Sequence, residues 1–339
     1  MSWTGQPERG SQWLMRFMVR LTLRLGWRAG HALLYPITAY FLLASPRSRA
    51  ASRHFLGKVL GREATVREQF RHLLTFAATL LDRVFLLTGR TEGYDIRVHG
   101  LEHLKARIDA GEGCLLLGAH LGSFEVLRAL ADRGCPVPVK ALMYEANAAL
   151  VNAVFRDLNP ARAAAVIPLG TTESVLRIRE CLARGELVGM LGDRITTGDK
   201  LVAVDFLGER AMLPVGPMLL ATVLKAPVIL FFGIRRGSRR YDITFEPFAE
   251  PADMATPARR ADLSGEVARY AVRLERMCRA HPYNWFNFYD FWGGRDEAST
   301  AGGTAANRRP RGGGTVLRPV ASGLGGRPRG GHGGTVASP

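Results

Sequence analysis

Short apolar runs alternate with amphipathic runs between residues 95 and 246, and this alternation limits the fold more than any other feature. The apolar runs have the length of strands and lie at residues 113–118, 137–143, 165–169, 187–191, 227–234 and 241–245. Amphipathic runs of helical length separate several of them, at residues 101–110, 124–132, 148–157 and 173–184. Strands joined by helices of this length favour parallel pairing with right-handed crossovers. The sequence therefore predicts an α/β fold in which a mostly parallel sheet is flanked by helices.

The apolar stretch at residues 213–234 has the length of a membrane span, but its composition argues against one. It contains Lys225 and three prolines, which interrupt a continuous helix. We predict a helix followed by a buried strand.

The N-terminal 50 residues form a separate basic and apolar segment. Within residues 11–28 an arginine recurs every fourth position from Arg16 to Arg28, beside Trp13 and several leucines. This pattern favours a helix lying at an anionic membrane surface, with a plain surface helix as the alternative. Residues 29–45 are apolar but contain His31 and Pro36, which favours an interfacial or re-entrant anchor over a true span or a buried core helix.

The net charge of +16 is concentrated at the two ends of the chain. Residues 1–72 hold twelve Lys and Arg against three acids, and residues 301–339 hold six Arg and no acid, which accounts for +15. The nearly neutral middle argues against a specific nucleic-acid-binding domain. The Gly- and Arg-rich end lacks large apolar side chains and is predicted to be disordered. We therefore predict three parts: a membrane-anchoring segment (1–50), a folded domain (51–297) and a tail (298–339).

The four cysteines are widely scattered and form no CxxC pair. This spacing favours buried, reduced thiols over disulfides or a zinc site. The sequence predicts no metal site.

The most informative motif follows the predicted strand at residues 113–118 and opens a predicted helix. It contains His120 and Glu125, and no other histidine of the chain is followed by an acid five positions later. On one helix the two side chains would diverge, so we predict that His120 lies in the loop and Glu125 in the first helical turn. Gly122 permits the turn, and Ser123 is a candidate helix cap. The amides at this helix start are suited either to stabilising an oxyanion or simply to capping the turn. A Glu125 carboxylate bonded to His120 would prepare the imidazole to act as a general base.

Two further features lie at the ends of predicted elements. Asp193 and Arg194 follow the strand at residues 187–191, where they are candidates either for binding an anionic donor or for a structural ion pair. The aromatic segment at residues 281–292 contains Trp285, and it is suited either to lining an acyl groove or to core packing.

Together these blocks resemble the bacterial lipid A biosynthesis (lauroyl/myristoyl) acyltransferase family, within the wider glycerolipid acyltransferase superfamily. The resemblance covers residues 10–295. It is carried by the motif from His120 to Glu125, the Gly-Asp-Arg block ending at Arg194, the stretch at residues 205–217, the aromatic segment ending at Trp292 and the N-terminal stretch at residues 35–41.

The resemblance implies an enzyme that transfers a fatty acyl group from a thioester of acyl carrier protein or coenzyme A to a hydroxyl or amine of a membrane lipid or glycolipid. It implies a His120–Glu125 dyad, no cofactor or metal, and a place at the cytoplasmic face of the bacterial inner membrane. By the same resemblance Gly122, Ser123, Asp193, Arg194 and Trp285 are candidates for substrate binding. The alternative is an inactive membrane-bound scaffold on the same fold.

One departure from the family pattern concerns the acceptor. Tyr144-Glu145 stands where lipid A enzymes often carry Tyr-Arg, and such an arginine is suited to an acceptor phosphate. The resemblance therefore leaves the acceptor open, with aminolipids and aryl-polyene-type glycolipids as alternatives to lipid A.

Overall fold

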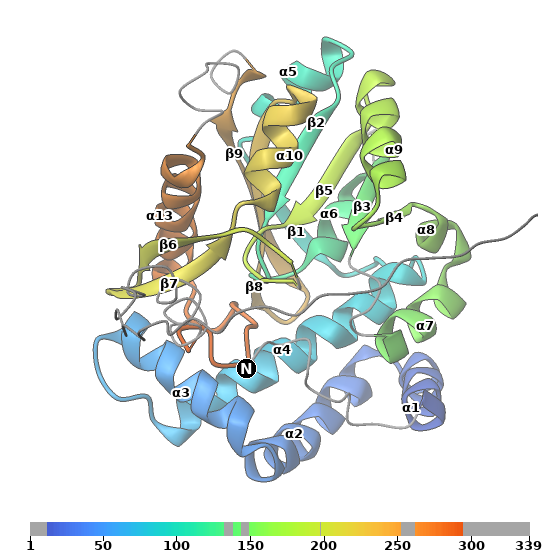
Figure 1. Cartoon of the computed structure of the whole chain (residues 1–339). Helices are drawn as coiled ribbons and strands as arrows, with labels where there is room; N and C mark the ends of the chain where they lie inside the picture. The colour runs from blue at the N-terminus through green and yellow to red at the C-terminus, as the bar shows by residue number, and fades with distance from the viewer. Residues whose placement is uncertain (1–11, 132–137, 144–148, 197, 252–261, 294–339) are drawn as a thin grey trace, which may run out of the picture. The chain divides into compact units, whose positions relative to one another are not determined.

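The computed structural model describes residues 12–131, 138–143, 149–196, 198–251 and 262–293. The predicted tail, the Tyr144-Glu145 pair and Cys135 lie outside these residues. Figure 1 shows the described elements, coloured from blue to red in the order in which they follow along the chain.

The described strands form a seven-stranded sheet in the order β1-β9-β8-β2-β5-β3-β4. Their bounds are β1 Asp95–His99, β2 Cys114–Gly118, β3 Val139–Met143, β4 Val166–Pro168, β5 Leu187–Leu191, β8 Val228–Gly237 and β9 Arg240–Ala249. Every neighbouring pair is parallel except β8 and β9. Those two are joined by a connection too short for a crossover, so they must be antiparallel. The predicted mostly parallel α/β fold is confirmed.

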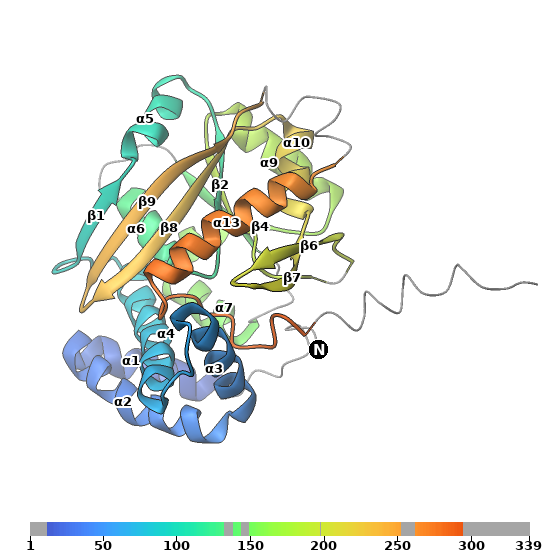
Figure 2. The ribbon, with the colours of Figure 1, turned by 90° about the vertical axis from the view of Figure 1, so that its left-hand side faces the viewer.

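Helices cover both faces of the sheet. Alternate residues of the central strand β2 pack in two different clusters, one on each face. Leu115 and Leu117 pack in a cluster with α9 (Thr172–Ala183), α10 (Gly216–Leu224) and α13 (Ser264–Ala280). Cys114 and Leu116 pack on the other side with α5 (Leu101–Asp109) and α6 (Phe124–Ala131). A strand buried on both faces reads as a continuous apolar run, which is why the predicted strands were visible in the sequence. Figure 2 shows α13 crossing one face of the sheet.

The predicted helix and strand within residues 213–234 correspond to α10 and β8. Two shorter helices, α7 (Ala149–Leu158) and α8 (Pro160–Ala164), precede β4. Strand β1 and the antiparallel hairpin of β6 (Leu201–Phe206) and β7 (Glu209–Pro214) were not predicted. Their burial alternates or is partial, so they lack the continuous apolar run of the central strands.

Between residue 12 and the sheet, four helices follow one another: α1 Gln12–Leu25, α2 Trp27–Ala44, α3 Pro46–Leu60 and α4 Val66–Leu87. The single helix predicted over residues 11–28 is divided, because Gly26 has a φ of +84° and ends α1. A domain boundary at residue 50 falls within α3. Among the described residues, no helix combines the length and apolar character needed to cross a bilayer. Helix α4 runs below the carboxyl ends of β2, β5 and β8 (Figures 1 and 2).

Candidate active site

His120 lies in the loop that leaves the carboxyl end of β2, as the sequence predicted. Helix α6 begins at Phe124, so the loop spans residues 119–123. Gly122 has a φ of +76°, and a Cβ atom added there would lie 2.0 Å from the Gly233 carbonyl oxygen. Only glycine fits this turn without moving β8.

The main chain of this loop is bonded to two neighbouring segments. The Gly122 amide donates to the Asn284 carbonyl (2.8 Å), and the Ser123 amide donates to the Gly233 carbonyl (2.8 Å). The His120 carbonyl accepts a hydrogen bond from the Phe286 amide (2.7 Å). The Gly122 and Ser123 amides therefore hold the loop in place, and the substrate-binding role predicted for these two residues stays a prediction.

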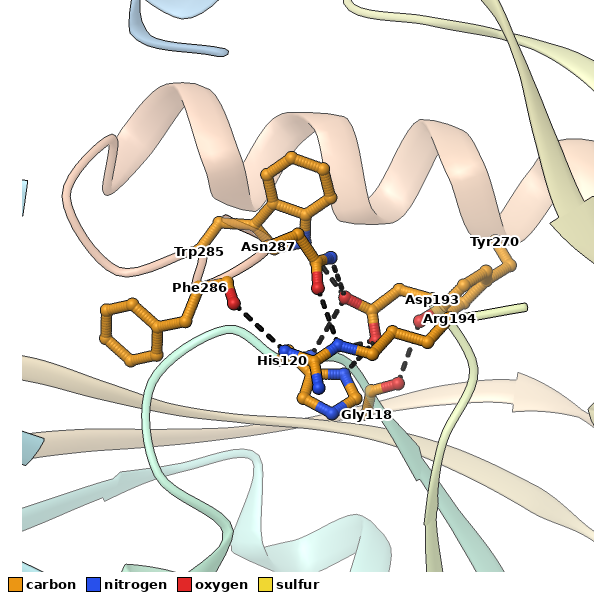
Figure 3. Close-up of polar contacts among 8 residues, drawn as sticks. All are labelled: Gly118, His120, Asp193, Arg194, Tyr270, Trp285, Phe286 and Asn287. Carbon is orange, nitrogen blue, oxygen red and sulfur yellow. Dashed lines mark hydrogen bonds and ion pairs between the residues drawn. The ribbon is translucent and has the colours of Figure 1, made fainter. Parts of the chain in front are cut away.

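Parallel pairing of β2 with β5 brings Asp193 to His120. In the register Gly118 lies opposite Leu191, and these are the last residues of the two strands. His120 and Asp193 each follow two residues after the end of their strand. The Asp193 carboxylate accepts hydrogen bonds from the His120 main-chain amide (2.9 and 3.0 Å) and lies 2.7 Å from Nδ1 of the imidazole. Figure 3 shows this contact among the surrounding polar groups. The two residues are 73 positions apart in sequence.

Asp193 is completely buried, and two further side chains donate to its carboxylate. Trp285 Nε1 and Asn287 Nδ2 both donate to Oδ2, at 2.9 and 2.8 Å. Tyr270 of α13 donates to the Gly118 carbonyl (2.8 Å) and holds the end of β2 (Figure 3). A buried carboxylate with this many donors stays ionised and cannot rotate away from the imidazole.

The pKa values of this pair follow from their surroundings. Burial and the positive charge of Arg194 lower the pKa of His120 from 6.5, although Asp193 opposes the shift. Burial alone raises the pKa of Asp193, but the charges and hydrogen bonds of His120, together with the Arg194 charge, outweigh it and lower that pKa to about 2. Because an ionised Asp193 can only accept, Nδ1 of His120 carries the proton and donates. Nε2 of the neutral imidazole is therefore the basic nitrogen, and the side chain is 26% exposed.

Glu125 lies in the first turn of α6, where the sequence placed it, but its described neighbours are arginines. Its carboxylate is 3.6 Å from Nε of Arg83 on α4 and 3.9 Å from Nη1 of Arg128. The motif predicts a Glu125 carboxylate on the imidazole of His120, whereas the carboxylate on Nδ1 is that of Asp193. The catalytic role of Glu125 stays a prediction.

Arg194 and Trp285 both lie beside this pair. Arg194 donates from Nε to Asn287 Oδ1 (2.8 Å) and from Nη2 to the Phe286 carbonyl (3.0 Å). Trp285 is fully buried among aromatic rings, including Phe55 at 4.7 Å between centroids. Of the predicted site residues, the structure brings His120, Asp193, Arg194 and Trp285 together.

Sequence reasoning missed Asn284 and Asn287, which sit between the aromatic residues of the closing segment. An asparagine in such a segment carries no pattern of its own, so only the contacts reveal it. His72 of α4 was also missed: its Nε2 donates to the Trp285 carbonyl (2.7 Å), and its Nδ1 accepts from Ser52 (2.9 Å). Burial lowers the pKa of His72 to about 4, so it stays neutral and fixes the main chain of Trp285.

The described cysteines form no hydrogen bond or ion pair with His120 or Asp193 that the structure shows. Cys114, Cys181 and Cys278 are buried free thiols, and burial raises the pKa of Cys114 to about 12. Within the described ranges, no three His, Cys, Asp or Glu side chains gather as a metal ion would require.

The chain matches the family described as bacterial lipid A biosynthesis acyltransferase over residues 7–293. No curated protein sequence matched the chain. The family match spans the N-terminal helices, the sheet and the closing aromatic segment. The chain therefore belongs to the bacterial lipid A biosynthesis acyltransferase family, whose members are acyltransferase enzymes.

Proposed function

We propose that His120 is the general base of an acyl transfer from a thioester to a membrane lipid or glycolipid, and that Asp193 orients its imidazole. The observation that carries this proposal is the 2.7 Å contact of Nδ1 with a fully buried carboxylate. That contact leaves Nε2, on a partly exposed side chain, as the nitrogen that accepts a proton. Family membership implies that the acceptor is a precursor of lipid A.

The reaction needs no nucleophile from the protein. Nε2 of His120 takes the proton of the acceptor hydroxyl or amine as that atom attacks the thioester carbonyl carbon. The new carbon–oxygen or carbon–nitrogen bond forms, the carbon–sulfur bond breaks, and the imidazolium returns its proton to the departing sulfur. Asp193 stabilises the imidazolium during these steps, as an ionised carboxylate does for a histidine base.

The direct test is an assay of the purified full chain with lipid A precursor. Acyl-acyl carrier protein and acyl-coenzyme A are supplied in separate reactions, and lipid products are measured by mass spectrometry. We expect the precursor to gain the mass of one acyl group with at least one donor, and the better donor is then identified by its kcat/KM. If neither donor acylates the precursor, a total bacterial lipid extract replaces it. Failure to acylate any lipid in that extract would contradict the proposal.

The pH dependence tests the charge environment of His120. The base is active when neutral, so kcat/KM should fall as the pH falls through the His120 pKa, which lies below 6.5. Because the Arg194 charge lowers this pKa, Arg194→Gln should raise it and move the acidic limb to higher pH. Arg194→Lys keeps the charge and serves as the matched control. The same limb in wild type and Arg194→Gln would show that the limb does not report His120.

We further propose that α1 and α2 attach the enzyme to an anionic membrane surface. Both helices expose large apolar side chains: Trp13, Phe17 and Leu25 on α1, and Tyr35, Tyr40, Phe41 and Leu43 on α2. Arg20, Arg24 and Arg28 are exposed beside them. Apolar side chains next to exposed cations suit the boundary between headgroups and acyl chains.

Trp13→Ala tests this attachment, since Trp13 is 72% exposed. We expect roughly tenfold weaker binding to vesicles of phosphatidylglycerol and phosphatidylcholine, in line with the loss of one large interfacial side chain. Val272→Ala, which removes an exposed apolar side chain from α13, is the control and should bind like wild type. Equal binding by both variants in a sedimentation assay would argue against attachment through α1.

A further inference from the structure

A buried carboxylate joins the N-terminal helices to the sheet. Asp82 of α4 is completely buried and accepts hydrogen bonds from four side chains. Trp27 Nε1 donates to Oδ1 at 2.7 Å, and the Tyr94 hydroxyl donates to the same oxygen at 2.8 Å. The Tyr241 hydroxyl (2.8 Å) and Arg235 Nε (3.0 Å) donate to Oδ2. The Asp82 side chain thus connects the first residue of α2 with a residue near the end of β8.

Burying the charges of Asp82 and Arg235 in the interior costs free energy, because both lose their hydration. The side chain of Arg235 is 8% exposed and that of Asp82 is fully buried, so both charges have lost most of their water. Such a pair adds little net stability compared with apolar residues, but breaking it leaves an uncompensated charge. Moving β8 away from α4 would therefore leave a buried charge without its partner.

The main chain of Arg235 continues the connection toward the catalytic loop. Its amide donates to Asn284 Oδ1 (2.9 Å), and its carbonyl accepts from Asn284 Nδ2 (3.3 Å). The Asn284 carbonyl in turn accepts the Gly122 amide (2.8 Å). Leu121 and Trp285 form the adjoining bridge between the two segments. Hydrogen bonds therefore connect Trp27, through Asp82, Arg235 and Asn284, to the loop that carries His120.

We propose that Asp82 and Asn284 are positioning residues that make the geometry of the His120 loop depend on the docking of α2. This inference rests on the proposed acyl transfer at His120 and adds to it a coupling between the N-terminal helices and the reaction. Neither residue touches the imidazole. Asp82 acts through Arg235, and Asn284 acts through the Gly122 amide. Coupling of this kind is measured as an effect of a change in α2 on the loop at the far end of the connection.

Hydrogen exchange measures that effect without any assay of activity. Trp27→Phe keeps an aromatic side chain, although a smaller one, and removes the indole Nε1–H that donates to Asp82. We expect exchange of the amides at residues 119–123, which include the Gly122 donor, to become roughly tenfold faster in this variant. The matched control is Thr79→Val on α4, which removes the hydrogen bond from Thr79 Oγ1 to the Thr75 carbonyl. Faster exchange confined to α2 and α4, or equal acceleration by the control, would overturn the proposal.

Kinetics give the second measurement. We expect Trp27→Phe and Asn284→Ala each to lower kcat about fivefold with KM changed less than about twofold, as a misplaced catalytic group does. Because both changes interrupt the same connection, the double variant should be little slower than the slower single variant. Effects on kcat that simply multiply would show independent structural roles. If the wild type itself transfers no acyl group, the proposed function fails, whereas the exchange result still decides the coupling.

Discussion

Replacing His120 with alanine should abolish nearly all acyl transfer while leaving the fold intact. The variant removes the proton acceptor, and general-base catalysis contributes on the order of 10²- to 10⁴-fold to a rate. The His120 side chain is partly exposed, so its loss creates no large buried cavity. The measurement is kcat with the preferred donor, together with lipid mass spectrometry of cells that express the variant in place of the wild type.

His103→Ala is a suitable control for this variant. His103 lies on α5, outside the loop that carries His120, and its side chain is 43% exposed. It should transfer acyl groups like the wild type. A His120→Ala enzyme with more than about a tenth of wild-type kcat would exclude His120 as the base, because proton transfer contributes more than that. The inactive-scaffold alternative would gain support if neither wild type nor variant changed any lipid.

The second large effect is expected for Asp193→Asn, with a loss of roughly a thousandfold in kcat. The amide keeps the shape of the side chain but removes the charge that stabilises the imidazolium and fixes the tautomer of His120. It also places an NH₂ group among donors, because Asp193 accepts from Trp285, Asn287 and the His120 amide. Circular dichroism and thermal melting of the variant would separate a loss of fold from a loss of catalysis.

Glu125→Gln is the matched comparison, because it removes the carboxylate that the sequence motif favoured. Its described partners are Arg83 and Arg128, so the variant removes a buried negative charge beside two guanidinium groups. We expect lower thermal stability and a loss of activity of about tenfold, since removing one charge from a buried group of charges destabilises the fold. If Glu125→Gln lost more kcat than Asp193→Asn at equal stability, Glu125 would be the orienting carboxylate.

Several features of this protein were determined by its sequence alone. The central strands are buried on both faces and therefore appear as apolar runs, which predicted the parallel sheet and its helices. The loop that carries His120 was also predictable, because it follows a buried apolar strand and contains a glycine at position 122 that permits the turn. The family was recognisable from blocks spread over most of the chain, and the match over residues 7–293 confirms it.

The partner of the imidazole was decided only by the tertiary structure. Spacing along the chain reports neighbours on one helix or strand, and it pointed to Glu125 because that residue is five positions away. Asp193 reaches His120 because β5 pairs directly with β2, although β3 and β4 lie between them in sequence. The order of strands in a sheet is set by packing of the whole domain, and no local pattern records it. The same reason hid the roles proposed for Asp82 and Asn284. Trp27 and Arg235 lie 55 and 153 positions from Asp82, and Arg235 lies 49 positions from Asn284.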